Sequence, residues 1–196
     1  TKTGRSKMSN VVSALDHAIF AGFAEVKEIG LQGMITLRGD LAAPAMKKAI
    51  KAATGCDVPT QRAVLHNADK GVAWMSPDEL LVLVPYEDAD KTVAILTKSF
   101  GKAHFLAENV SDARAVFQIK GPNAAEVLAK VCPVDLSPAA FKPGMIRRSR
   151  LAQIAAAFWM VDADTFQLVC FRSVADYAFG VLTTCAESGT EVGYLR

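Results

Sequence analysis

The chain has 196 residues, of which 51% are apolar and 21% are charged, so it has enough apolar side chains for a sizeable core and is not disordered over most of its length. Its 22 Lys and Arg residues nearly balance its 20 Asp and Glu residues, and the net charge of +2 gives no electrostatic reason to expect nucleic acid or a membrane surface as a partner. The length fits one generous domain or two small ones.

The first ten residues carry three basic side chains, Lys2, Arg5 and Lys7, but no apolar segment follows them. This pattern is not that of a secretory signal, and it predicts a flexible arm over residues 1–10. The longest strongly apolar stretch, residues 154–161, is far shorter than the roughly 20 residues of a membrane helix. We therefore expect a cytoplasmic protein without a membrane partner.

The first half of the chain alternates between apolar patterns with helical spacing and with strand spacing. In chain order these patterns predict a short amphipathic helix over 11–23, a strand at 34–38, a helix over 42–53, strands at 72–75 and 79–84, and a helix over 88–100. Pro44 fits the first turn of the second helix. Gly55 and Gly101 are placed to end the second and third helices.

The second half begins the same pattern again after Asp112. It predicts a strand at 113–120, a helix over 123–131, strands at 145–150, 153–161 and 165–171, and a final helix over 174–187. We expect Asn123 to cap the helix that follows it, because its short polar side chain can accept a hydrogen bond from a free N–H group of the first turn.

The two halves are copies of each other. Trp74-Met75 and the hairpin after it align with Trp159-Met160 at an offset of 85 residues, and the strand at 35–40 aligns with 117–122 at an offset of 82. A change of three residues in the offset is what a loop insertion between the elements would produce. We expect the two tryptophans to be matching core residues of their hairpins.

The repeat predicts an α+β fold made of two split β-α-β units, each an antiparallel sheet with helices on one face. We expect residues 11–196 to form a single body from half-repeats at about 26–108 and 109–188. A cleft between the two units is the expected place for a ligand.

Few residues form patterns that carry chemistry. The four cysteines (56, 132, 170 and 185) and the three histidines are scattered, without the spacing of a zinc site, and the cysteines are expected to be buried as small hydrophobic residues. The glycine-rich nucleotide-binding motifs and the G-x-S-x-G motif of hydrolases do not occur. The residues themselves therefore predict no catalytic and no metal site.

Arg147, Arg148 and Arg150 place three guanidinium groups within four residues. On a strand, Arg148 and Arg150 share one face and Arg147 lies on the other. The cluster fits a clamp for a carboxylate-rich ligand such as a folate tail, or a set of ion pairs at an interface. A solvated edge strand whose charges oppose aggregation explains it equally well.

Residues 109–128 resemble the folate-binding aminomethyltransferase (glycine-cleavage T-protein) family, through Asp112, the Gly121-Pro122 turn and a helix with Glu126 and Leu128. Over roughly 12–188 the chain more closely resembles the gamma subunits of heterotetrameric sarcosine oxidase. The segments that carry this second resemblance are 33–40 and 74–81.

The T-protein family has a G-G-x-x-D-D segment whose carboxylate engages folate, and the resemblance places Ile154 and Ala155 at its paired aspartate positions. Neither side chain can accept a proton or a pterin N–H bond. The resemblance therefore implies this fold without catalytic residues and without cofactor-binding residues. Arg147, Arg148 and Arg150 are left as candidates for a vestigial folate site or an interface.

The resemblance implies a noncatalytic structural gamma subunit that assembles with alpha, beta and delta subunits. Such a complex oxidatively demethylates sarcosine to glycine, passes the one-carbon unit to tetrahydrofolate and produces hydrogen peroxide, with FAD, FMN, NAD and zinc held by the other subunits. The competing hypothesis is a free-standing folate-dependent aminomethyltransferase-like enzyme or one-carbon binding protein, in which Asp112 or Asp40 replaces the missing acid. A third hypothesis is an adaptor that kept the fold for docking alone.

Overall fold

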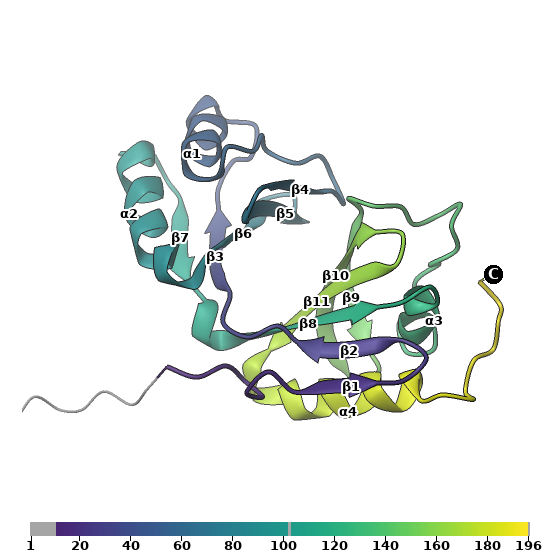
Figure 1. Ribbon diagram of the computed structural model, residues 1–196. Helices are drawn as coiled ribbons and strands as arrows, with labels where there is room; N and C mark the ends of the chain where they lie inside the picture. Colours follow the sequence, from purple (N-terminus) through teal and green to yellow (C-terminus); the bar gives the residue numbers. More distant parts are fainter. Residues whose placement is uncertain (1–10, 102, 196) are drawn as a thin grey trace, which may run out of the picture.

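The computed structural model describes residues 11–101 and 103–195, so the arm expected over residues 1–10 lies outside the described residues. Within this part of the chain, two antiparallel sheets pack face to face and the helices cover their outer faces (Figure 1). The α+β prediction of two antiparallel sheets, each with helices on one face, is confirmed.

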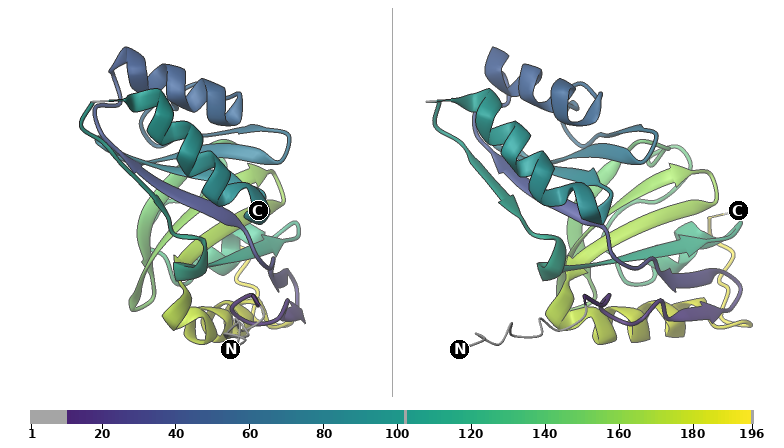
Figure 2. Two further views of the ribbon diagram at one scale, coloured as in Figure 1. Left: turned by 90° about the vertical axis from the view of Figure 1, so that its left-hand side faces the viewer. Right: turned by 60° about the vertical axis from the view of Figure 1, so that its left-hand side comes forward.

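The first sheet has the strand order β4-β5-β6-β3-β7. Its elements are β3 (Gly33–Arg38), α1 (Pro44–Thr54), β4 (Val64–Asn67), β5 (Lys70–Ser76), β6 (Glu79–Val84), a 3-10 turn (Tyr86–Asp88), α2 (Ala89–Phe100) and β7 (Leu106–Asn109). The helices α1 and α2 lie side by side on its outer face (Figure 2).

The second sheet has the strand order β1-β2-β8-β11-β10-β9. Its elements are β1 (Ile19–Ala21), β2 (Glu25–Glu28), a 3-10 turn (Ser111–Ala113), β8 (Arg114–Lys120), α3 (Ala124–Ala129), β9 (Ile146–Leu151), β10 (Ile154–Asp162), β11 (Thr165–Phe171), a second 3-10 turn (Arg172–Val174) and α4 (Ala175–Ala186). No helix in the described part of the chain is long and apolar enough to cross a membrane.

Local signals in the sequence explain the helices that were predicted correctly. Pro44 occupies the first turn of α1, where a missing N–H group costs nothing, and Met46 and Ile50 are buried on the face turned to the sheet. Gly55 follows the helix with a φ of 74°, a left-handed conformation in which a β-carbon would be strained.

The helix predicted over 11–23 is wrong. The carboxylate of Glu28 accepts hydrogen bonds from the Ser13 hydroxyl and the His17 N–H group, each at 2.9 Å, and His17 has a positive φ of 60°. The chain then forms β1, in which Phe20 pairs with Val26 of β2. The apolar spacing is compatible with a helix, but these contacts with a later segment hold the backbone in turns and a short strand.

Asn123 occupies the N-cap position of α3, as predicted, but its side chain makes no capping hydrogen bond. The helix is shorter than expected and ends at Ala129. The strands β2, β4 and β7 were not predicted. Each has only four residues, and the exposed side chains of β4 and β7 leave no clear apolar alternation to detect.

The two halves of the chain exchange strands. The strand β2 comes directly before β3, yet it pairs with β8 of the second sheet, where Val26 lies opposite Ile119. In the same way β7 comes before β8, yet it pairs with β3, where Leu37 lies opposite Ala107. Each sheet is therefore completed by the segment that leads into the other sheet.

The alignment of the repeat through Trp-Met is one residue out of register. In the first sheet Arg38 pairs with Glu79, and in the second sheet Lys120 pairs with Thr165, so the equivalent hairpins are offset by 86 residues. A shift of one residue turns every side chain of a strand to the opposite face. The two tryptophans are therefore not matching core residues.

The inner faces of the sheets form an inter-sheet cluster of buried residues: Met34, Val64, Ala73, Leu81, Leu83, Val116, Ile146, Ala157, Trp159 and Val169. Trp159 is 0% exposed there, whereas Trp74 is half-buried and faces the core beneath α1 and α2. Backbone hydrogen bonds from Val64 N–H to Gly144 O (2.8 Å) and from Ile146 N–H to Arg62 O (2.9 Å) also join the two halves.

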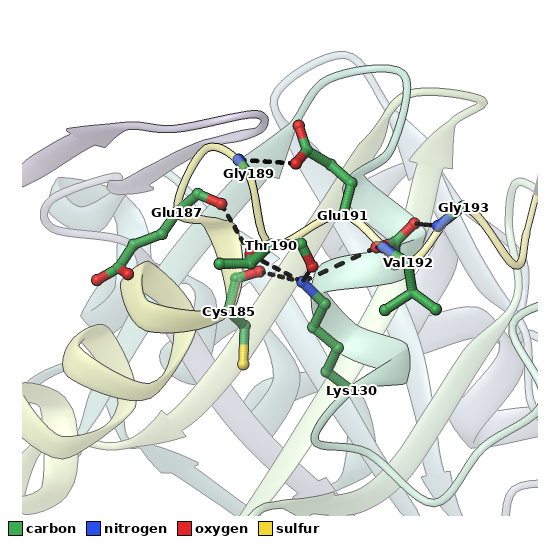
Figure 3. Close-up of polar contacts among 9 residues, drawn as sticks. Lys130, Cys185, Glu187, Gly189, Thr190, Glu191, Val192 and Gly193 are labelled. Atoms are coloured by element: carbon green, nitrogen blue, oxygen red, sulfur yellow. Dashed lines mark hydrogen bonds and ion pairs between the residues drawn. The ribbon is translucent and has the colours of Figure 1, made fainter.

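The C-terminal segment is tied down over α3 (Figure 3). The buried carboxylate of Glu126 accepts hydrogen bonds from the Val192 N–H and from the Gly193 N–H, the second at 2.9 Å. The Lys130 ammonium donates to the carbonyl oxygens of Cys185 (2.9 Å) and Thr190 (2.8 Å). These contacts give a segment without regular secondary structure a fixed path.

Candidate functional site

A cavity of about 270 Å³ opens between the two sheets, beside the inter-sheet cluster. Its walls come from both halves of the chain: Thr36, Met75, Glu79 and Leu81 from the first, and Arg114, Arg148, Ser149, Ala155, Ala156, Ala157, Val169, Cys170 and Phe171 from the second. The cleft expected between the two units is thus present, as a small cavity.

The cavity exists because small side chains on the inner face of the second sheet lie between large ones. Ala157 of β10 lies opposite Arg148 of β9, and Phe171 of β11 lies opposite Arg114 of β8. Alternation along β10 brings Ala155 to the same face as Ala157. The short alanine side chains form the bottom of the cavity, and the arginine side chains form its walls.

Arg148 connects the two sheets across the cavity. Its Nη1 atom donates a hydrogen bond to the carbonyl oxygen of Met75 at 3.1 Å and lies 3.4 Å from Oε2 of Glu79. Because the Arg148 side chain is 51% exposed, we expect this ion pair to add little to stability. One guanidinium face and several N–H groups are left for another partner.

Arg114 lines the opposite side of the cavity without an acid of its own. Its guanidinium carbon lies 4.0 Å from the centre of the Phe171 ring, a cation–π contact, and it makes no hydrogen bond or ion pair with a side chain or carbonyl of the described residues. Burial lowers the pKa of Arg114, Glu79 raises it and Arg148 lowers it. The two guanidinium groups are therefore close enough to repel each other.

The structure does not gather the three predicted arginines at one place. Arg147 lies on the other face of β9, with its guanidinium 5.2 Å from the ring centre of Phe141. Arg150 donates to the carbonyl oxygen of Ala152 at 3.2 Å, in its own turn. Arg148 is the one of the three that lines the cavity.

Arg114 was missed in the sequence because it is a single arginine far from the cluster. Alternation along its strand gives the signal that could have found it, since Arg114 shares a face with Val116 of the inter-sheet cluster. Recognising that Arg114 and Arg148 lie on the same face of one sheet requires the strand order, which one sequence does not provide.

The other residues weighed for folate chemistry do not converge on the cavity. Ala155 lines it, whereas Ile154 packs against the core beneath α3 and α4. Asp112 accepts a hydrogen bond from the Tyr86 hydroxyl at 2.8 Å, and Asp40 accepts one from the Ala42 N–H group at 2.9 Å. Neither aspartate lines the cavity, where Glu79 is the one carboxylate among the lining residues.

The cysteines are free thiols, and Cys56, Cys132 and Cys170 are buried, as expected for small hydrophobic residues. Cys185 is half-buried. Burial raises the pKa of Cys132 to about 12 and that of Cys170 to about 11, so neither is poised as a nucleophile. Within residues 11–101 and 103–195, no group of three His, Cys, Asp or Glu side chains is placed to hold a metal ion.

The raised pKa of Cys132 predicts a loss of stability at alkaline pH. The neutral thiol is favoured in the folded state, so its contribution is intact below the unfolded pKa of about 8.5 and is lost as the pH rises toward 12. Between pH 8 and pH 10 we expect a decrease of about 1–2 kcal/mol in the free energy of unfolding from this thiol. Urea denaturation at both pH values measures it.

The comparison variant for this prediction is Cys132→Ala, whose unfolding free energy should fall less steeply with pH than that of the wild type. Cys56→Ala, which removes another buried cysteine, serves as the control for removal of a thiol in general. Equal slopes for the wild type and Cys132→Ala would contradict the assignment.

Comparison with known proteins places the chain in a family. Residues 38–187 match the model of the "sarcosine oxidase, gamma subunit family". The sarcosine oxidase subunit gamma of an Arthrobacter species is 31% identical over 173 residues, which cover 86% of this chain and 83% of the relative. That of Corynebacterium sp. (strain P-1) is 29% identical over 181 residues, covering 90% of this chain and 87% of the relative.

Solved structures agree with this placement. A chain of the heterotetrameric sarcosine oxidase from Corynebacterium sp. U-96 superposes with a TM-score of 0.77 at 26% identity, covering 86% of this chain and 87% of that one. Aminomethyltransferase T from Bartonella henselae shares the fold, with a TM-score of 0.59 at 15% identity over 80% of this chain and 45% of that one. Both resemblances noted in the sequence are thereby confirmed, and the chain belongs to the sarcosine oxidase gamma subunit family.

Proposed function

We propose that this chain is a noncatalytic structural subunit of a heterotetrameric sarcosine oxidase and that it packs against alpha, beta and delta subunits. The observation that carries the proposal is the likeness to a chain of such an assembly over 86% of this chain and 87% of that one. The complex would oxidatively demethylate sarcosine to glycine, transfer the one-carbon unit to tetrahydrofolate and produce hydrogen peroxide. A cytoplasmic location stays our prediction for it.

The residues that line the cavity support a noncatalytic role. Ala155 and Ala157 offer no group that can accept or donate a proton, and Glu79 lies beside Arg148. The volume of about 270 Å³ is below the roughly 300–1,000 Å³ of ordinary small-molecule sites. In the proposed complex, FAD, FMN, NAD and zinc are held by the other subunits.

Assembly tests the proposal. A tagged copy of the full chain, produced together with the alpha, beta and delta subunits of its source organism, should co-purify with them in fixed stoichiometry and with flavin absorbance and sarcosine oxidation. The three other subunits produced without it should give less intact complex. An intact, fully active complex that forms without the chain and does not retain it when it is added would overturn the proposal.

A folate-dependent enzyme or one-carbon binding protein is the second candidate, because Arg148 and Ala155 line the same cavity. In that case the isolated chain should release or absorb heat on titration with tetrahydrofolate, and Arg148→Ala should reduce the affinity. Calorimetry with tetrahydrofolate and with glutamate separates the two functions, since a folate-dependent protein binds tetrahydrofolate much more tightly than glutamate alone and a structural subunit does not.

A further inference from the structure

The cavity between the sheets has an excess of positive charge. Arg114 and Arg148 line it, and Glu79 is the one acidic side chain among its lining residues. Glu79 interacts with Arg148 at 3.4 Å, a distance that makes a weak ion pair, and Arg114 has no hydrogen-bond acceptor among the described residues. We propose that this cavity is a binding site for a carboxylate group, which the guanidinium groups of Arg114 and Arg148 hold from two sides.

The donors that remain unused fit this ligand class. A guanidinium group presents five N–H donors in a planar fork that matches the two oxygens of a carboxylate. Arg148 donates only from Nη1 to the described residues, and the Arg114 side chain donates to none of them. A half-buried cation without an acceptor has lost part of its hydration, so an anion that enters the cavity restores hydrogen bonds that the fold leaves unmade.

The surroundings of Arg114 hold it ready for a ligand. Its guanidinium lies over the Phe171 ring at 4.0 Å, which limits the directions in which the side chain can turn. Glu79 attracts Arg114 more strongly than Arg148 repels it, and a further negative charge between the two guanidinium groups relieves the remaining repulsion. The fold therefore supplies two converging cations before any ligand arrives.

The size of the cavity limits what can carry the carboxylate. The volume of about 270 Å³ is below the roughly 300–1,000 Å³ of ordinary small-molecule sites. The carrier is therefore a small organic acid or the Asp or Glu side chain of another protein chain. Phe171 is 50% exposed and the Arg148 side chain 51% exposed, so the mouth of the cavity can be reached from solvent.

Benzoate is a suitable probe, with benzamide as its neutral isostere. The full chain is labelled with ¹⁵N-arginine, and the side-chain Nε–H signals are followed by NMR during titration. Saturable shifts are expected at Arg114 and Arg148 with benzoate, none with benzamide, and none at Arg150, which belongs to the same strand as Arg148 but bonds to its own turn. The absence of a saturable shift at Arg114 and Arg148 overturns the proposal.

Two variants assign the binding. Arg114→Gln and Arg148→Gln should each weaken benzoate affinity by roughly tenfold to a hundredfold, the usual loss of a charged hydrogen-bond pair. Arg150→Gln should leave the affinity unchanged. An equal loss of benzoate affinity in all three variants, with unchanged thermal midpoints of unfolding, would mean that the affinity depends on net charge alone. This result would also overturn the proposed site.

Experiments on the assembled complex distinguish the two possible sources of the carboxylate, a partner subunit and a small organic acid. If a partner subunit supplies it, benzoate no longer binds to the complex and Arg114→Gln reduces retention of the chain. If a small acid is the natural ligand, the complex still binds benzoate and the variant assembles as the wild type does. The titration uses the chain alone, so a negative result would not contradict the assembly proposal. In the same way, a failure to assemble would not contradict the carboxylate site.

Discussion

Replacement of Trp159 with alanine is expected to lower the free energy of unfolding by about 3–5 kcal/mol, the usual cost of removing a fully buried aromatic side chain. Trp159 is 0% exposed and contacts both sheets through the inter-sheet cluster. Its loss therefore opens a cavity at the contact between the two halves. Urea denaturation followed by circular dichroism measures the change.

Trp74→Ala is the matched control for this prediction. The two tryptophans have the same neighbour in sequence, a methionine, but Trp74 is half-buried and lies on the helix side of its sheet. Its replacement should cost less than about 2 kcal/mol, because less apolar surface is lost from the core. Equal costs for the two variants would show that the sequence alignment of the hairpins, and not the register of the sheets, describes the repeat.

Trp159→Phe adds a test of the indole nitrogen. The Trp159 Nε1 atom is buried without a hydrogen-bond partner among the described residues. Phenylalanine keeps most of the ring and removes this unpaired donor, whose burial costs about 1–3 kcal/mol. The phenylalanine variant should therefore be much closer to the wild type than the alanine variant.

Separation of the half-repeats, residues 26–108 and 109–188, is expected to abolish folding of both. The first boundary cuts β2 and separates it from its partner β8 in the second fragment, and the second boundary cuts β7 before Asn109, which pairs with Ile35. Each fragment would also expose its side of the inter-sheet cluster to water. We therefore propose that residues 11–196 behave as a single body, and we expect neither fragment to show cooperative unfolding or protected amides in hydrogen exchange.

A second pair of fragments is the control. A cut between residues 104 and 105 lies before β7 and leaves every strand and helix whole. When the two pieces are mixed, β2 of the first and β7 of the second can reach their partner strands, and a folded complex should form. A cooperative unfolding transition in the isolated 109–188 fragment would contradict the single body.

The core of each repeat could be predicted from the sequence because its signals are local. Gly39 and Gly121 end the first strands, Pro44 begins a helix, and the apolar runs of β6 and β11 are visible in the sequence. Helix and strand lengths in this part of the chain follow from side chains that act on their own neighbours.

The elements that were missed depend on residues distant in sequence. The segment before β1 takes its path from Glu28 and Arg172, the second of which donates to the carbonyl oxygens of Val12 and Ser13 at 2.9 Å. Such contacts override the helical spacing of the apolar residues. The bulges at the ends of β5 and β10 fix the register of each hairpin, and they are invisible to an alignment that matches identical letters.

Part of the candidate site was missed for the same reason. Arg148 belongs to a conspicuous cluster, and period-two alternation separated it correctly from Arg147. Arg114 and Glu79 come from other strands and join the cavity through the strand order and the packing of the sheets. A site built at the contact between two repeats contains residues that no local motif connects.

The exchange of strands also sets the order of events during synthesis. Val26 of β2 leaves the ribosome long before its partner Ile119, and at about 5–20 residues per second the delay is roughly 5–20 s. During this interval β2 can pair with β1, which precedes it, but its partner on the other side, β8, has not yet been made. We infer that the nascent chain completes its first sheet only when β7 arrives, and that β1 and β2 wait for β8 before they can join the second sheet. A gamma chain of this fold therefore presents a finished surface to other chains only after nearly all of it has been translated.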